Sequence, residues 1–192
     1  MFVPPPMEKL TSPKYPGSIL FKMKKLIILN GPAGAGKTTI ARAVWKKIPR
    51  TAVISLDEIK WLISDYKSNS FDLNLASKVG LAMSEVYLEN KINVIIEKAF
   101  CDYKYVEPFV NLAKKTKSKL LIYNLEAPLD IIKKRALKRP KTNIKHNKPP
   151  LKLSKVLRLY NYYNKGKFPV KRTFDTSKLS QRKIVNQILK DI

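Results

Sequence analysis

Cysteine, histidine and acidic residues are all scarce in this chain of 192 residues. The single cysteine, Cys101, excludes a disulfide bond within the chain and fits a reducing compartment. The single histidine, His146, has no cysteine or acidic cluster near it in the sequence, so we expect neither a zinc site nor a Ser/His/Asp triad. Lys and Arg number 39 against 14 Asp and Glu, a formal net charge of +25. This charge indicates either phosphate-bearing or other anionic partners, or a compositional bias toward lysine.

Long hydrophobic runs are missing as well. No run approaches the roughly 18–20 residues that a helix needs to cross a bilayer, and prolines interrupt the first 22 residues, so we expect no membrane partner and no secretory signal. The expected location is therefore the cytoplasm. We predict that residues 1–22 form a Pro-rich, loosely ordered extension and that residues 23–192 form one domain, since a chain of this length buries a sufficient core by itself.

Short β-like runs alternate with helical patterns from Leu26 onward, which is typical of an α/β protein. The predicted strands lie at 26–29, 52–56, 92–96, 120–125 and 170–174. The predicted helices lie at 40–48, 57–63, 75–86, 106–113, from Pro128 to Pro140, 153–160 and 184–189. This pattern predicts a three-layer sandwich, with a mostly parallel five-stranded sheet between helices on both faces.

The strongest motif is Gly-Pro-Ala-Gly-Ala-Gly-Lys-Thr at 31–38, which satisfies G-x-x-x-x-G-K-[ST] after an apolar strand and before an amphipathic helix. Its glycines let backbone N–H groups turn inward around a phosphate, and the helix that follows adds its positive dipole end. Lys37 is expected to reach the β- and γ-phosphates, and the Thr38 hydroxyl is expected to bind Mg²⁺. The predicted nucleotide-binding residues are Gly31, Pro32, Ala33, Gly34, Ala35, Gly36, Lys37, Thr38 and Thr39.

Four further short motifs follow the phosphate loop. They are Ile-Ser-Leu-Asp-Glu-Ile-Lys at 54–60, Val-Ile-Ile-Glu-Lys at 94–98, Glu-Ala-Pro at 126–128 with Arg135 and Arg139 behind it, and Phe-Asp-Thr-Ser at 174–177. With these motifs the chain, from about residue 24 to its end, resembles the P-loop kinases. The resemblance is to the branch of AAA-type ATP-binding proteins that contains zeta-toxin-like, chloramphenicol-phosphotransferase-like and polynucleotide-kinase-like enzymes. It implies a P-loop NTPase fold, with ATP and Mg²⁺ as ligands.

The resemblance assigns roles to two carboxylates. Asp57 matches the carboxylate that faces the acceptor hydroxyl as base or orienting group, and Lys60 stands where such kinases often have an acceptor-gripping arginine. Glu97 matches the Walker B carboxylate that holds Mg²⁺, usually an Asp. The alternatives are that Asp57 only caps the following helix and that Glu97 is a surface residue paired with Lys98.

The resemblance also implies a basic lid, at about residues 139–155. Arg135 would lie against the adenine, Arg139 would reach the phosphates as a catalytic residue, and Asp175 would line the adenine pocket. The alternatives are a solvated arginine face and an ordinary Asp-Thr-Ser turn.

Positive charge is concentrated around this lid. Residues 131–174 contain fifteen basic side chains and no acidic ones. The interleaved aromatic residues favour either a surface that stacks nucleic-acid bases or a solvated lysine face with the tyrosines partly in the core. These aromatic residues are Tyr160, Tyr162, Tyr163 and Phe168.

Three functions are compatible with these patterns. The first is an ATP-dependent kinase that phosphorylates a hydroxyl or phosphate of a small-molecule or nucleotide-like acceptor. The second is a polynucleotide 5′-hydroxyl kinase, and the third is an ATPase or regulatory ATP-binding module with water as the only acceptor. The sequence does not identify the acceptor or the oligomeric state.

Overall fold

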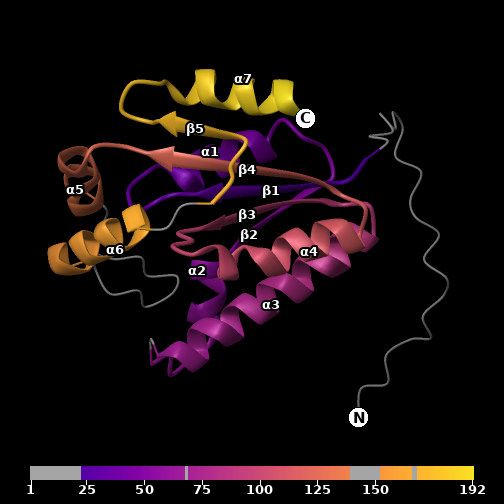
Figure 1. The fold of residues 1–192 in the computed structure, drawn as a ribbon, viewed down its shortest axis with the longest axis horizontal. Helices are drawn as coiled ribbons and strands as arrows, with labels where there is room; N and C mark the ends of the chain where they lie inside the picture. Colours follow the sequence, from indigo (N-terminus) through magenta and orange to yellow (C-terminus); the bar gives the residue numbers. More distant parts are fainter. Residues whose placement is uncertain (1–22, 68, 139–151, 166–167) are drawn as a thin grey trace, which may run out of the picture.

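The structure is a computed structural model that describes residues 23–67, 69–138, 152–165 and 168–192 (Figure 1). Three predictions lie outside the described residues: the extension at 1–22, the main part of the lid at 139–151, and the role of Arg139. The described residues contain no helix that is both long enough and apolar enough to cross a membrane.

The centre of the molecule is one parallel sheet. Its strands are β1 (Lys25–Asn30), β2 (Thr51–Ser55), β3 (Asn93–Lys98), β4 (Lys119–Glu126) and β5 (Arg172–Asp175), in the spatial order β2-β3-β1-β4-β5. All four pairings are parallel, so the predicted mostly parallel, five-stranded sheet is confirmed. β1 lies in the middle, and the chain therefore leaves the sheet's centre directly into the phosphate loop.

Helices cover both faces of the sheet (Figure 1). One face carries α1 (Lys37–Trp45), α5 (Leu129–Leu137), α6 (Leu153–Lys165) and α7 (Gln181–Asp191). The other carries α2 (Leu56–Ile59), α3 (Ser70–Glu89) and α4 (Glu107–Lys115). Two 3₁₀ turns complete the described elements, η1 (Lys60–Leu62) and η2 (Tyr103–Tyr105).

The two-sided arrangement follows from the alternation of side chains along a strand. In β1, Ile27 and Leu29 join the core beneath α1 and α7, whereas Leu26 and Ile28 join the core beneath α3 and α4. All four are fully buried, which is why β1 reads as an unbroken apolar run. Such a run is expected only of a strand covered on both faces.

All five strands end at the same edge of the sheet. Figure 1 shows the arrowheads of β4 and β5 pointing to the end of the molecule where α5 and α6 lie. The register places Glu97 of β3 beside Leu29 of β1 and Ser55 of β2, and Glu126 of β4 beside Asp175 of β5. Ligands of open α/β sheets bind beyond these carboxyl ends, and every predicted motif within the described residues reaches this edge.

Candidate active site

The phosphate loop joins β1 to α1, and its glycines adopt backbone conformations that other residues avoid. Gly31 has φ 153°, and an added Cβ would lie 2.2 Å from the carbonyl oxygen of Leu125. Gly36 has φ 89° and immediately precedes α1, but an added Cβ would meet no atom within 4 Å. Packing thus requires glycine at position 31. At position 36 the space that a Cβ would fill is empty. An open cradle at a helix N-terminus suits a phosphate.

Lys37 folds back across this loop. Its ammonium donates hydrogen bonds to the carbonyl oxygens of Gly31, at 2.8 Å, and of Pro32, at 3.0 Å. The Ala35 N–H closes the turn by donating to the same Pro32 carbonyl at 3.2 Å. The lysine charge is therefore held over the loop, where it can meet the anionic oxygens of a bound phosphate.

Asp57 lies in the first turn of α2, directly after β2, and receives two ammonium groups. Nζ of Lys60 donates to its Oδ1 at 2.7 Å, and Nζ of Lys98 donates to the same oxygen at 3.1 Å. The prediction that Asp57 only caps the helix is wrong, because Ser55 occupies the cap position and the Asp57 carboxylate binds the two lysines. The Asp57 side chain is 49% exposed, so a ligand can reach it.

The neighbouring charges decide the ionisation of Asp57. Burial by itself would raise the pKa of the carboxyl group, but the ammonium groups of Lys98 and Lys60, with a contribution from Lys37, hold the pKa well below its ordinary value. The charge of Lys37 is thus near enough to Asp57 to act on the ionisation of its carboxyl group. Asp57 is thus an ionised hydrogen-bond acceptor at neutral pH and only a weak base.

Glu97 is buried at the end of β3, with 6% of its surface exposed. Its Oε2 is buried without a hydrogen-bond partner among the described residues. The alternative of a surface ion pair with Lys98 is wrong. Consecutive strand residues point to opposite faces, and Lys98 turns to Asp57 instead. A buried carboxylate oxygen without a partner is costly, which fits a position that a hydrated Mg²⁺ would satisfy together with the Thr38 hydroxyl.

Asn30, a residue that the motifs did not single out, joins β1 to β4 and to the segment after β3 at this edge. Its amide donates to Oδ1 of Asn124 at 3.0 Å, and its own Oδ1 accepts from the backbone N–H of Phe100 at 2.7 Å. The only sequence signal was a polar residue at the end of a fully buried apolar strand. Asn30 fixes the start of the phosphate loop relative to the segment that follows Lys98.

Arg135 contacts the loop after β5. The guanidinium donates to Oγ1 and to the carbonyl oxygen of Thr176, both at 2.8 Å, and the Thr176 hydroxyl donates to the Glu126 carbonyl oxygen at 3.0 Å. Asp175 forms a local turn, since its Oδ1 accepts from the backbone N–H and the hydroxyl of Ser177. These bonds lower the pKa of Asp175.

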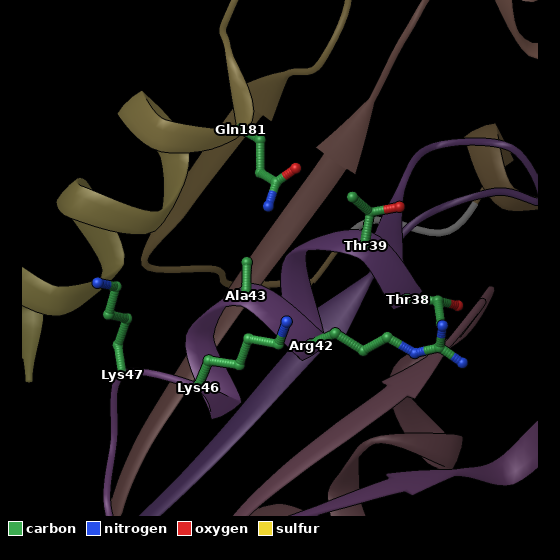
Figure 2. Close-up of a pocket in the computed structure, with 7 residues that line it drawn as sticks. All are labelled: Thr38, Thr39, Arg42, Ala43, Lys46, Lys47 and Gln181. Atoms are coloured by element: carbon green, nitrogen blue, oxygen red, sulfur yellow. The ribbon is translucent and has the colours of Figure 1, made fainter.

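A shallow hollow of about 430 Å³ lies between α1 and the start of α7 (Figure 2). Thr38 and Thr39 lie at its loop end, and Gln181 points toward α1 across it. Neither Asp57 nor Glu97 lines this hollow. The hollow thus adjoins the helix that follows the phosphate loop, and it is separate from the carboxylates of Asp57 and Glu97.

The other candidates pack inside the molecule. Tyr163 is buried, and Tyr160 and Phe168 pack against the two cores, which leaves Tyr162 as the exposed member of the predicted aromatic set. Burial raises the pKa of the Cys101 thiol to about 11, so the thiol stays protonated. Among the described residues there is no cluster of three or more His, Cys, Asp or Glu side chains of the kind that holds a metal ion without a bound phosphate.

The fold and the phosphate loop define a P-loop kinase-like protein. A family model described as "AAA domain" (AAA_33) matches residues 26–159, and the chain belongs to this family. No curated protein sequence matches the chain.

Solved structures repeat the fold at low sequence identity. A candidate kinase from Chloroflexus aurantiacus is 19% identical, with a TM-score of 0.69 over 88% of this chain and 99% of that one. The tunicamycin resistance protein of Deinococcus radiodurans is 20% identical, with a TM-score of 0.60 over 88% and 95% of the two chains. The APS kinase CysC of Mycobacterium tuberculosis, in complex with AMPPNP and APS, is 12% identical, with a TM-score of 0.63 over 88% and 96%.

Proposed function

We propose that the protein is an ATP-dependent phosphotransferase that moves the γ-phosphoryl group to a hydroxyl of a small-molecule or nucleotide-like acceptor. The observation that carries this proposal is that the phosphate loop after β1 and Asp57 after β2 lie at the same edge of the parallel sheet. Lys37 on the loop acts electrostatically on an accessible carboxylate that belongs to a different strand end. A phosphate donor and a hydroxyl acceptor need these two groups side by side.

The roles follow from the chemistry of each group. Lys37 and the loop amides would hold the β- and γ-phosphates, and Asp57 would accept a hydrogen bond from the acceptor hydroxyl. The bond between the γ-phosphorus and the β–γ bridging oxygen breaks, the acceptor oxygen takes the phosphoryl group, and its proton passes to solvent. Because its pKa is depressed, Asp57 orients the hydroxyl rather than removing its proton beforehand. Lys60 would contact the acceptor.

Thr38 and Glu97 would hold Mg²⁺, in line with the buried carboxylate oxygen that has no partner among the described residues. The ion would supply neutralisation of phosphate charge. Arg135 and Asp175 would border the nucleoside, and Arg139 would reach the phosphates. We place this catalytic unit in residues 23–192 and the enzyme in the cytoplasm.

The proteins of similar structure are of different kinds. They include a shikimate kinase bound to shikimate, the APS kinase described above, and a protein of an RNA repair complex, of which this chain matches only 44%. The packing of Tyr160, Tyr163 and Phe168 against the cores removes most of the predicted stacking surface and favours a small acceptor over a polynucleotide.

The test is transfer of labelled γ-phosphate from ATP to a panel of hydroxyl compounds. Lys37→Ala should lose ATP binding and all turnover, while Asp57→Asn should keep ATP binding and lose transfer. Phosphate release that proceeds at one rate with and without every acceptor, and that survives in Asp57→Asn, would reject a kinase in favour of an ATPase.

A further inference from the structure

Two lysines from separate elements bind Asp57, and a third lysine lies near enough for the Asp57 charge to act on it. Lys60 comes from η1, Lys98 from the end of β3 and Lys155 from α6. The first two bind one oxygen of one carboxylate, so the group of three side chains carries a net positive charge before Lys155 is counted. A kinase needs Lys37 for its nucleotide, but the phosphate loop does not explain these three additional charges.

Lys60 and Lys98 are held in place rather than extended into solvent. Their side chains are only 15% and 20% exposed, respectively. Lys60 also lies 5.8 Å from the centre of the Tyr66 ring. Each ammonium has three N–H donors, and the hydrogen bond to Asp57 takes one of them, so donors remain for a ligand. Removing so much charge from water is costly unless a counter-charge is provided.

Lys155 belongs to α6 and lies within electrostatic reach of Lys60 and Asp57. The helix is anchored by the buried side chains of Val156 and Tyr163, and the Tyr163 hydroxyl donates to Oε1 of Glu126 at 3.4 Å. Burial lowers the pKa of Lys155, and the nearby charge of Lys60 lowers it further, with a contribution from Arg158 and an opposing one from Asp57. Within the described residues the Lys155 ammonium has no hydrogen bond or ion pair of its own.

The residue type indicates which anion would fit. Arginine presents a planar fork that matches carboxylates in a bidentate way, whereas lysine is a compact point charge. Lysines that approach from three elements can each bind a different oxygen of a tetrahedral anion. We propose that the acceptor carries a phosphate, or the equivalent sulfate, near the hydroxyl that is phosphorylated, and that Lys60, Lys98 and Lys155 bind this group. The proposal rests on the proposed kinase function.

The experiment measures an anion at a site separate from the phosphate loop. The full chain is first saturated with AMPPNP and Mg²⁺, and inorganic phosphate is then titrated and followed by calorimetry. We expect saturable phosphate binding to the loaded protein. Lys98→Gln and Lys155→Gln should each weaken it about tenfold, the loss of one charge-assisted hydrogen bond. Lys152→Gln, an exposed lysine immediately before α6, is the matched control and should change nothing.

Lys155→Gln is the variant less exposed to misfolding. Lys155, unlike Lys98, has no hydrogen bond to Asp57 that the substitution would remove. If loaded wild-type protein binds no phosphate, or if both Lys98→Gln and Lys155→Gln bind it as wild type does, the proposal is wrong. Failure to bind AMPPNP would instead refute the proposed kinase function, because loading is measured first.

A second measurement compares acceptors with and without a phosphate group, to identify the kind of molecule that carries the anion. Labelled transfer is compared between a sugar and its monophosphate, between a nucleoside and its 3′-monophosphate, and with a short 5′-hydroxyl oligonucleotide. A preference of about tenfold or more for a monophosphate, lost in Lys155→Gln, supports the proposal. A preference for uncharged partners, or transfer to the oligonucleotide alone, contradicts it.

Discussion

Arg135 of α5 donates hydrogen bonds to the hydroxyl and the carbonyl oxygen of Thr176, both at 2.8 Å. Thr176 lies 41 residues further along the chain. The same hydroxyl donates to the Glu126 carbonyl oxygen, so β4, α5 and the loop after β5 are joined at one point. This contact connects the first residue of the predicted arginine pair to the loop that was expected to line the adenine pocket. It is a relationship that the sequence motifs, taken separately, did not specify.

We expect Arg135→Ala to weaken nucleotide binding about tenfold, because both the side chain and the loop position would be lost. Thr176→Val, which removes only the hydroxyl anchor, should give a smaller loss in the same direction. Calorimetric titration with AMPPNP measures both. Lys138→Ala, at the exposed end of the same helix, is the control. Reduced stability with unchanged nucleotide affinity in Arg135→Ala would make the contact purely structural.

The ionisation of Asp57 predicts the pH dependence of the proposed phosphoryl transfer. Its pKa lies below the ordinary value of about 3.9, so the carboxylate and the stability it gains from the lysines are present above roughly pH 4 and are lost as the pH falls through the depressed pKa. The rate of phosphoryl transfer should therefore have no acidic limb from Asp57 between pH 8 and pH 5. Asp57→Asn should lower this rate about 100-fold or more while sparing nucleotide binding.

A pH–rate profile of wild-type protein, with Asp57→Asn beside it, tests this expectation. Glu58→Gln, in the same short helix, serves as the comparison variant. A fall in rate with an apparent pKa near 6 that disappears in Asp57→Asn would show that Asp57 acts as a general base with a raised pKa.

Glu97→Gln should separate stability from function. Replacing a buried carboxylate that lacks a partner among the described residues with a neutral amide of the same shape should leave the free energy of unfolding unchanged or raise it by about 1 kcal/mol without metal. The Mg²⁺ concentration needed for half-maximal nucleotide binding or activity should rise about 10- to 100-fold. Urea denaturation and Mg²⁺ titrations check the two parts. A destabilised variant with normal Mg²⁺ dependence would give Glu97 a structural role only.

Two glycines of the phosphate loop should respond differently to alanine. Gly31→Ala places Cβ 2.2 Å from the Leu125 carbonyl oxygen, a clash that backbone movement must relieve, and we expect a loss of several kcal/mol or failure to fold. Gly36→Ala meets no atom and carries only the strain of a positive φ, about 1–3 kcal/mol. Gly36→Ala should therefore fold but bind AMPPNP poorly. Urea denaturation and calorimetry measure the two effects, and equal destabilisation of both variants would contradict this assignment.

The alternation of strands and helices was predictable from the sequence, since it depends on local periodicity and on which residues are apolar. Every predicted strand and helix within the described residues occurs, with shifts of a few residues at the ends. β5 begins at Arg172, two residues after the predicted start at Val170, and α1 begins at Lys37 because the phosphate loop passes straight into it. Helix ends depend on backbone hydrogen bonds, which a hydrophobic pattern does not record.

The partners of the charged residues could not be predicted in the same way. The sequence offered Lys98 only as a neighbour of Glu97, yet strand geometry turns the two apart and brings Lys98 to Asp57. Lys155 was one of fifteen basic residues in an acid-free segment, and only the packing of α6 distinguishes it from the others. Asn30 belonged to no motif, and the motif at 174–177 gave no indication that Thr176 would bind Arg135.

By itself, the sequence determined the phosphate loop, because its glycine positions and its lysine act within eight consecutive residues. It also determined that a covered parallel sheet would carry that loop, because buried strands need apolar residues on both faces. The order β2-β3-β1-β4-β5 was decided by the tertiary structure, and with it the meeting of Asp57, Lys60, Lys98 and Lys155. The interaction energy of two charges depends on the distance between them in space. That distance is set only when the strands and helices have packed.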